Sequence, residues 1–173
     1  KSGGTSHLIS SMTVHNVIYE ERPELLEVLY NPFYMDWRGE EPLGEQPWFS
    51  IPLFSEKDGY ISSRFTSRNY CESCSRFGDE YKLTDIQSEA LDVVQEISNR
   101  EELRVSMRME DGDIQFVNNH VTLHARDAYE DYEESNFKRH LLRMWIGLPD
   151  KKRRPLASSI DGRYQLVKNG GIP

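Results

Sequence analysis

Residues 112–127 read GDIQFVNNHVTLHARD, and residues 138–146 read KRHLLRMWI. Both runs have strand-like apolar patterns, and an acidic loop separates them. Because side chains alternate across a strand, His124 lies at the polar end of one face of the first strand. The same rule places Arg139 and Arg143 together on one face of the second strand. The two predicted strands therefore present a candidate metal ligand and a candidate anion clamp.

The second run carries large apolar groups on both of its faces, so we expect a strand that is buried on both sides. Guanidinium groups are costly to bury unless they meet anions. Arg139 and Arg143 on such a strand therefore favour a ligand that carries a carboxylate.

His120 and His124 are spaced as in helical metal sites, but the residues around them favour a strand. Four strand residues span about 13 Å, whereas each imidazole must come within roughly 2 Å of a shared ion. The two rings therefore cannot bind one metal ion on a regular strand. A lone strand histidine is more often a hydrogen-bonded structural residue than a ligand, and the residues alone leave both interpretations of His124 open.

The composition is that of one domain with an acidic surface. The chain has 173 residues, 29% charged residues and a net charge of -8, and this length is sufficient for a single core. An acidic excess argues against a nucleic-acid surface, and no apolar run approaches the roughly 20 residues needed to cross a bilayer. The basic cluster at residues 151–154 is interpreted as a solvated turn rather than a localisation signal. We expect a cytoplasmic protein.

Cys71 and Cys74 form an isolated C-x-x-C in a polar stretch. A structural zinc site needs four ligands, and the sequence holds no second cysteine pair. A redox motif would need a βαβ context, so we interpret the pair as ordinary reduced thiols in a cytosolic loop. A zinc site formed by these cysteines with histidines stays a further alternative.

Local signals predict several helices and strands before residue 112. Ser10 predicts the start of a helix that reaches about residue 19, and Pro23 suits the first turn of a second helix. Thr84 and Gln87 predict a capping box on the clearest helix, which we expect to pack on a sheet. Strands are expected at residues 7–9, 48–51, 60–64 and 104–109, the last in a hairpin with the strand that begins at residue 113.

The run NNHVTLHARDAY, followed by KRHLLRMWI, resembles the C-terminal signature of the taurine dioxygenase and clavaminate synthase-like family of iron(II)/2-oxoglutarate oxygenases. The strings GGTS, SSMTVHN and RPELLEVL occur upstream in the order of the family, so the resemblance extends from Gly3 to about Leu148. It implies a mixed α/β, mainly β fold, a distorted double-stranded β-helix (jelly roll) with flanking helices. It also implies that residues 1–150 are the C-terminal part of one such domain and that residues 151–173 are a basic, loop-rich tail.

The resemblance assigns roles to four residues. The distal iron-binding histidine of the family falls on His124, and the arginine for the remote carboxylate of 2-oxoglutarate falls on Arg139. Arg143 falls where family members use an arginine near the substrate or cosubstrate, and Ser6 where a hydroxyl helps to hold the same carboxylate. Turn chemistry is an equal interpretation for Ser6, as is a structural ion pair with the acidic loop for Arg143.

These assignments imply the chemistry of a non-haem iron(II) dioxygenase that acts on a small molecule. Two histidines and one carboxylate hold the iron and leave three positions for 2-oxoglutarate and dioxygen. Succinate and carbon dioxide are released, and an aligned substrate is oxidised. The protein supplies placement and excludes water.

The sequence departs from the family at the proximal iron motif. No Asp or Glu lies two residues after any of the five histidines, whereas the family has H-x-D or H-x-E shortly before the loop that here is Gly3-Gly4. We therefore expect an N-terminal portion upstream of Lys1, or a second chain, to supply the other iron ligands. Without them this portion should be inactive. The alternative is a non-catalytic jelly-roll subunit with a binding or regulatory role.

Overall fold

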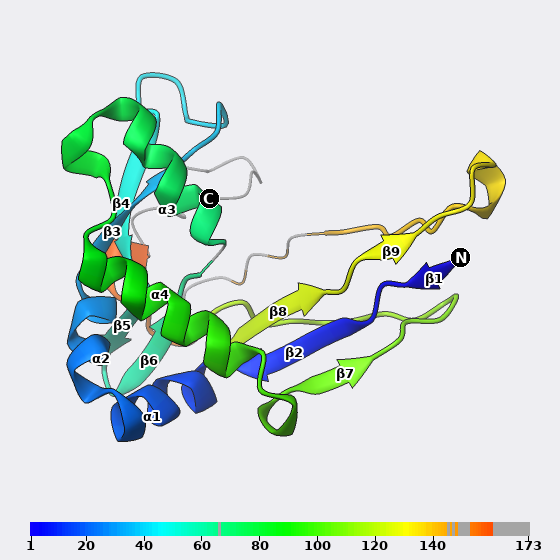
Figure 1. Cartoon of the computed structure of the whole chain (residues 1–173), viewed down its shortest axis with the longest axis horizontal. Helices are drawn as coiled ribbons and strands as arrows, with labels where there is room; N and C mark the ends of the chain where they lie inside the picture. The colour runs from blue at the N-terminus through cyan, green and yellow to red at the C-terminus, as the bar shows by residue number, and fades with distance from the viewer. Residues whose placement is uncertain (66, 145, 147, 149–152, 161–173) are drawn as a thin grey trace.

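The computed structural model describes residues 1–65, 67–144, 146, 148 and 153–160. Its helices and strands form a helix-rich body and an open sheet that projects from this body (Figure 1). The strands are β1 (Ser2–Gly3), β2 (Ser6–Ser10), β3 (Pro32–Asp36), β4 (Trp48–Pro52), β5 (Phe54–Lys57), β6 (Tyr60–Ser63), β7 (Val105–Met107), β8 (Thr122–Arg126) and β9 (Tyr129–Glu130). The helices are α1 (Ser11–Glu21), α2 (Pro23–Tyr30), α3 (Arg68–Glu72) and α4 (Asp85–Ser98), with 3-10 turns η1 (Ser73–Phe77), η2 (Asp79–Tyr81), η3 (Glu101–Leu103) and η4 (Ser135–Phe137).

Two helix starts follow the predicted signals. The Ser10 side chain accepts hydrogen bonds from the backbone N–H groups of Met12 and Thr13, at 3.2 and 3.4 Å, so α1 begins at Ser11. Pro23 occupies the first turn of α2, which ends at Tyr30 as expected. Both predictions are confirmed because a cap and a helix-opening proline act on backbone groups within one turn.

Helix α4 also begins as predicted. The Gln87 N–H donates to Thr84 Oγ1 at 3.3 Å, and the Thr84 N–H donates to Gln87 Oε1 at 3.1 Å, which completes the capping box. Its buried face packs mainly against α1 and α2, so the prediction that it packs on a sheet is wrong. None of the described helices is long and apolar enough to span a membrane.

The two hairpins of the body confirm the strands predicted at residues 48–51 and 60–64. Strand β3 pairs with β4, and β5 pairs with β6, both in antiparallel register. The turn between β5 and β6 is built on Asp58 and Gly59, both with positive φ, as in the mirror-image turns that favour Gly. The buried core of the body draws side chains from both hairpins and from α1, α2 and α4.

The open sheet has the antiparallel order β7-β2-β8, and beyond it β1 pairs with β9. The register does not change between the two ladders, because Gly3 faces Tyr129 and Ser6 faces Arg126. Two further hydrogen bonds bridge the interval, from the Gly4 N–H to Ala128 O at 3.1 Å and from the Asp127 N–H to Thr5 O at 2.9 Å. Residues 2–10 and 122–130 therefore form one long two-stranded ribbon.

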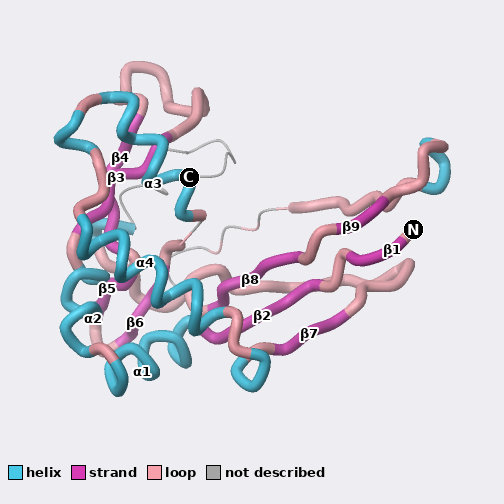
Figure 2. The backbone as a smooth tube through the Cα atoms, in the orientation of Figure 1, coloured by secondary structure: helices cyan, strands magenta, loops and turns pink. Residues whose placement is uncertain are grey.

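The predicted strand at residues 113–124 is only partly present. Strand β8 begins at Thr122, and Figure 2 shows the preceding residues as a loop. The Val121 N–H donates to Asn118 O and the His120 N–H donates to Asn118 Oδ1, each at 3.1 Å. This asparagine turn interrupts the alternating pattern. The expected hairpin is wrong too, since β7 pairs with β2 instead.

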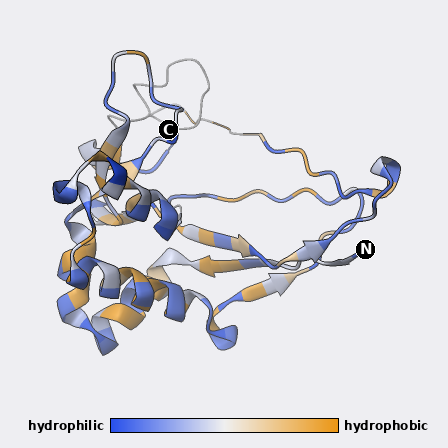
Figure 3. Cartoon of the chain, turned by 45° about the horizontal axis from the view of Figure 1, so that its top comes forward, coloured by the Kyte–Doolittle hydropathy of each residue, from blue (hydrophilic) through white to orange (hydrophobic). Residues whose placement is uncertain are grey.

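The strand predicted at residues 138–146 is also wrong for the described part of that run, where no strand is assigned. Figure 3 colours the chain by hydropathy and shows hydrophobic residues in this run; their side chains are exposed rather than buried on both sides. Leu142 and Met144 are 89% and 84% exposed. Because the described part of the run is not a strand buried on both faces, that particular reason for expecting anions at Arg139 and Arg143 does not hold: Arg143 is exposed and Arg139 is half-buried. Trp145 lies outside the described residues.

Residues 153–160 contribute to the core although they belong to the predicted tail. Leu156 and Ile160 are 8% and 1% exposed and lie in the main buried cluster. The rest of the predicted tail, residues 151–152 and 161–173, lies outside the described residues. The predicted boundary at residue 150 stays a prediction.

Cys71 and Cys74 are free thiols, but they lie in α3 and η1 rather than in a loop. Both are buried. Burial raises the pKa of Cys71 to about 12 and that of Cys74 to about 11. Such thiols stay protonated, as expected for structural rather than reactive cysteines.

Candidate functional site

The side chain of Arg139 contacts the ribbon at Gly4. Arg139 Nη1 donates to Gly4 O at 2.8 Å, across 135 positions of the sequence. The backbone of Arg139 is held in turn, since its N–H donates to Asp131 Oδ1 at 3.2 Å. The backbone and the guanidinium group of Arg139 are therefore each held by a hydrogen bond.

A second guanidinium nitrogen of Arg139 is still available. Nη2 is buried and has no hydrogen-bond partner in the described structure. A buried donor of a charged group is costly unless an acceptor reaches it. An anionic ligand would satisfy it, so the orphaned nitrogen suits the carboxylate predicted for Arg139.

Gly4 leaves space for this guanidinium. A Cβ atom at Gly4 would lie 2.5 Å from Arg139 Nη1, and Gly4 has a φ of +76°. We expect Gly4→Ala to cost about 1–2 kcal/mol of stability through the left-handed backbone and to displace the guanidinium. If Arg139 binds 2-oxoglutarate, the affinity of the full-length protein for it should fall about tenfold.

Gly3→Ala is the matched control for this prediction. Its Cβ would lie 2.3 Å from the backbone oxygen of Ala128, which cannot swing away as a side chain can. Gly3→Ala should therefore lower the unfolding midpoint more than Gly4→Ala. Calorimetric titration and thermal unfolding measure the two effects. An unchanged affinity for 2-oxoglutarate in Gly4→Ala would argue against the role of this contact.

His124 lies on the same face of the sheet as Ser6. His124 is directly opposite Leu8, and Ser6 is directly opposite Arg126, so alternation puts all four side chains on one side. His124 is exposed and Ser6 is half-buried. The sheet thus brings two of the predicted site residues onto a shared surface.

Arg143 acts on His124 through its charge. The pKa of His124 is lowered, first because part of the ring is desolvated although the residue is exposed overall, and second by the positive charge of Arg143. A neutral imidazole is the form that binds metals. The ion pair considered for Arg143 is not found among the described carboxylates.

The described residues do not by themselves form a metal site. No three His, Cys, Asp or Glu side chains there come together in a way that could hold an ion. The described residues thus place no further ligands with His124 and give no support to the alternative zinc site of Cys71 and Cys74. The roles assigned to His124, Arg139, Arg143 and Ser6 stay predictions.

Sequence reasoning missed a polar network on the other face of the sheet. The buried ring of His7 has Nδ1 at 2.8 Å from Ser106 Oγ and Nε2 at 2.9 Å from Asp127 Oδ1. The second contact is an ion-pair distance rather than a well-directed hydrogen bond. His7 thereby links β7, β2 and the end of β8. Its position opposite Ala125 follows only from the register, which no local pattern predicts.

Arg126 was also missed, although its spacing from His124 could have revealed it. The two residues are separated by one position on β8 and so share a face. The Arg126 guanidinium lies over the ring of Tyr129, 4.2 Å from its centre.

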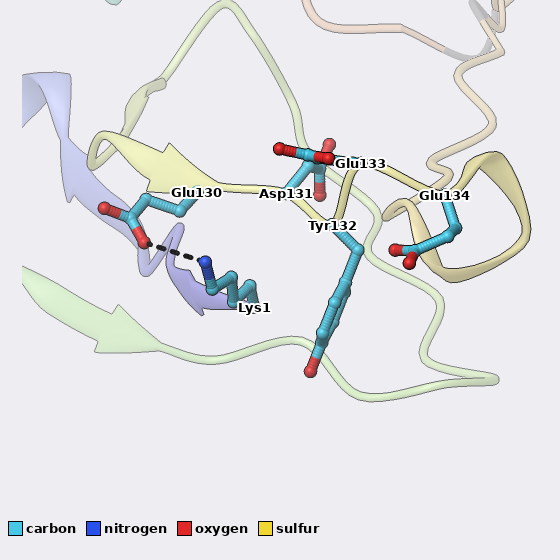
Figure 4. Close-up of a pocket in the computed structure, with 6 residues that line it drawn as sticks. All are labelled: Lys1, Glu130, Asp131, Tyr132, Glu133 and Glu134. Carbon is cyan, nitrogen blue, oxygen red and sulfur yellow. Dashed lines mark ion pairs between the residues drawn. The ribbon is translucent and has the colours of Figure 1, made fainter.

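A hollow at the end of the β1–β9 arm is acidic (Figure 4). Asp131 is part of it, and Lys1 lies at 4.0 Å from Glu130. Its lining consists of Lys1, Glu130, Asp131, Tyr132, Glu133 and Glu134. Four carboxylates against one ammonium make this hollow unsuitable for a dianion such as 2-oxoglutarate.

The chain is similar to known proteins over most of its length. Residues 1–145 match the family described as Taurine catabolism dioxygenase TauD, TfdA family. The chain is 39% identical over 162 residues to the FR-33289 synthase of Streptomyces rubellomurinus, covering 92% of this chain and 47% of that protein. It is 33% identical over 144 residues to a taurine hydroxylase-like protein of Stachybotrys chartarum, covering 82% of this chain and 36% of that protein. The chain thus spans about half, or less, of the length of these relatives.

Proposed function

Because this chain belongs to the taurine dioxygenase (TauD/TfdA) family, we propose that it forms the cosubstrate-binding part of a non-haem iron(II)/2-oxoglutarate dioxygenase. The protein would oxidise a small-molecule substrate and release succinate and carbon dioxide. Arg139, with Ser6 and Arg143, would hold 2-oxoglutarate, and His124 would be one iron ligand.

The observation that carries the proposal is the guanidinium of Arg139. One nitrogen is fixed by Gly4 O, and its buried neighbour Nη2 lacks an acceptor. A carboxylate at Nη2 would complete the hydrogen bonding of the group and balance its charge. The residues present therefore fit the remote carboxylate of 2-oxoglutarate.

The fit to iron is partial. His124 offers an imidazole on an exposed face next to Ser6, but the described residues supply no further ligands beside it. We propose that the remaining histidine and carboxylate come from residues that precede Lys1 in the full-length protein or from a second chain. Bound iron would activate dioxygen for the oxidation of 2-oxoglutarate and the substrate.

Each residue of this chain then has a positioning task. Arg139 would set the distance of 2-oxoglutarate from the sheet, and the ribbon would fix the position of Arg139 relative to His124. Ser6 would donate a hydroxyl hydrogen bond to the same carboxylate. Arg143 would keep a positive charge beside His124 and so favour anionic ligands near it.

We also propose that the fold is completed as a distorted double-stranded β-helix. The open sheet and the exposed apolar side chains after Arg139 support this, because exposed apolar surface favours a further covering layer. Leu141, Met144 and Ile146 would then lie against that layer. Residues 1–150 would be one part of a single domain.

The proposal is tested by replacing His124 in the full-length protein. We expect His124→Ala to weaken iron(II) binding at least about tenfold, because even the loss of groups that only orient a ligand has such an effect. Iron content after dialysis and succinate formed from 2-oxoglutarate are the two measurements. His140→Ala, another exposed histidine, is the control and should retain both.

Two results would contradict the proposal. If the full-length protein binds neither iron(II) nor 2-oxoglutarate, the non-catalytic binding or regulatory subunit is the better explanation. If His124→Ala binds iron as well as the unchanged protein, His124 is not a ligand.

A further inference from the structure

The buried ring of His7 connects all three strands of the open sheet. Its Nδ1 lies 2.8 Å from Ser106 Oγ on β7, and its Nε2 lies 2.9 Å from Asp127 Oδ1 just after β8. His7 is 8% exposed, whereas the Asp127 side chain is 55% exposed. A buried imidazole is costly unless both of its nitrogens meet polar groups. The two contacts therefore hold the ring, and the ring in turn holds Asp127.

The contact between His7 and Asp127 runs diagonally across the ribbon. His7 is directly opposite Ala125, and Asp127 follows Ala125 by two residues, so all three side chains lie on one face. His124 precedes Ala125 and therefore lies on the other face. The diagonal contact thus ties the two strands together behind the face that carries the predicted iron ligand.

The third strand of the sheet ends close to this contact. Strand β7 pairs with β2 from Leu8 to Ser6, and among the described residues the ribbon continues beyond Ser6 as two strands (Figure 1). Gly3 and Gly4 lie in this continuation, with φ of +73° and +76°. Two-stranded ribbons twist more than larger sheets, and glycine restricts the backbone least. The contact of His7 therefore restrains the ribbon where its support by β7 stops.

Both hydrogen bonds that hold Arg139 lie beyond this point. The guanidinium of Arg139 donates to Gly4 O, three residues before His7. The backbone N–H of Arg139 donates to Asp131 Oδ1, four residues after Asp127. Three to four strand residues span about 10–13 Å. A change in twist at His7 is therefore transmitted to Arg139 along both strands of the ribbon.

We propose that His7 is a positioning residue for the cosubstrate site. Its contact with Asp127 fixes the twist of the ribbon, and this twist sets where the Arg139 guanidinium lies relative to His124. The inference deepens the proposed function and rests on it in taking Arg139 as the anchor of 2-oxoglutarate. Because its ring lies on the face opposite to His124, His7 acts through Asp127 and the ribbon rather than by contact with the iron or the cosubstrate.

The contact does not require a charged ring. A neutral imidazole with its proton on Nε2 and a charged imidazole both present an N–H to the Asp127 carboxylate, and the Ser106 hydroxyl can donate to Nδ1 or accept from it. An amide nitrogen in place of Nε2 can also donate to Asp127, whereas a phenyl ring cannot. Gln and Phe at residue 7 therefore separate the polar contact from the volume of the side chain.

Amide hydrogen exchange of His7→Phe in the full-length protein tests the inference. The N–H groups of Gly4 and Asp127 bond across the ribbon, to Ala128 O and Thr5 O, and report directly on its opening. We expect both to exchange at least about tenfold faster in His7→Phe, because the ribbon opens locally more often. The affinity for 2-oxoglutarate, measured by calorimetric titration, should fall about tenfold.

Two variants distinguish positioning from general destabilisation. His15→Phe is the matched control, because His15 is also buried and its ring also has a polar partner, Tyr30 Oη at 3.1 Å, but it lies in α1. It should leave the exchange of the Gly4 and Asp127 amides and the affinity for 2-oxoglutarate unchanged. His7→Gln should recover most of both, since its amide can donate to Asp127.

Asp127→Ala keeps the test valid if His7→Phe does not fold, because it removes the same contact from an exposed position. It should speed exchange of the Gly4 amide and weaken 2-oxoglutarate binding in the same way. The inference is overturned if both variants leave this exchange unchanged, or if faster exchange leaves a measurable affinity for 2-oxoglutarate unchanged. It is also overturned if His15→Phe has the same effects or if His7→Gln recovers neither property.

Failure of the proposed function gives a different result. In that case 2-oxoglutarate binds to none of the proteins, including the unchanged one. Faster exchange at Gly4 and Asp127 in His7→Phe, with normal exchange there in His15→Phe, would then leave the role of His7 in holding the ribbon standing.

Discussion

Arg139→Met in the full-length protein is expected to weaken 2-oxoglutarate binding by roughly 100-fold or more. The substitution keeps much of the side-chain volume but removes the guanidinium group. In that group Nη1 is bonded to Gly4 O, and the buried Nη2 lacks an acceptor in the described structure. The bound carboxylate would lose its charge-assisted hydrogen bonds and stay desolvated. Calorimetric titration with 2-oxoglutarate measures the change.

Arg139→Lys separates charge from geometry. The ammonium keeps the positive charge but cannot bond Gly4 O and a carboxylate with the same planar fork. We expect Arg139→Lys to fall between the unchanged protein and Arg139→Met. Equal 2-oxoglutarate affinity in all three proteins would show that the cosubstrate binds elsewhere.

Phe54→Ala should lower the free energy of unfolding by about 3–5 kcal/mol. Phe54 is 0% exposed, and its ring contacts the edge of His15 with the ring centres 5.2 Å apart. The Tyr30 ring lies on a further side, at 6.1 Å. Truncation would leave a cavity between α1, α2 and β5 that these rigid rings cannot fill.

Urea unfolding of the full-length protein measures this loss. Tyr19→Ala is the control, because Tyr19 lies on α1 but is 65% exposed. Its effect should stay within about 0.5 kcal/mol. Similar midpoints for Phe54→Ala and Tyr19→Ala would mean that the described core is not what stabilises the protein.

The elements that the sequence predicted well depend on local interactions. Ser10 and Thr84 cap their helices through atoms no more than three residues away, so the signal and the structure lie in the same few residues. The strand predicted at residues 113–121 is wrong for a related reason. Apolar and polar residues alternate there as in a strand, but Asn118 lies in a turn, and β7 pairs with β2 rather than with this segment. An alternating sequence pattern specifies which face of a strand each side chain lies on, but it does not specify which strand pairs with it.

The site could be predicted only in part for the same physical reason. Family motifs pointed to His124 and Arg139; the structure places His124 within the ribbon and the Arg139 guanidinium against it. The contact of Arg139 with Gly4 and that of His7 with Asp127 join residues more than 100 positions apart, and no periodicity encodes them. The exposed segment after Arg139 was wrongly expected to be buried because apolar residues indicate burial without indicating what covers them.

The unchanged register of the ribbon limits how related chains can vary in length. A single residue inserted between Gly4 and Ser6 would turn every following side chain of β2 to the opposite face of the sheet. Ser6 would part from Arg126, and His7 would lose Ser106. Deletions and insertions should therefore be tolerated in the loop between β7 and β8, where residues 110–119 join no ladder, and be excluded from the paired segments. The ribbon therefore fixes the number of residues between the predicted site residues as well as supporting them.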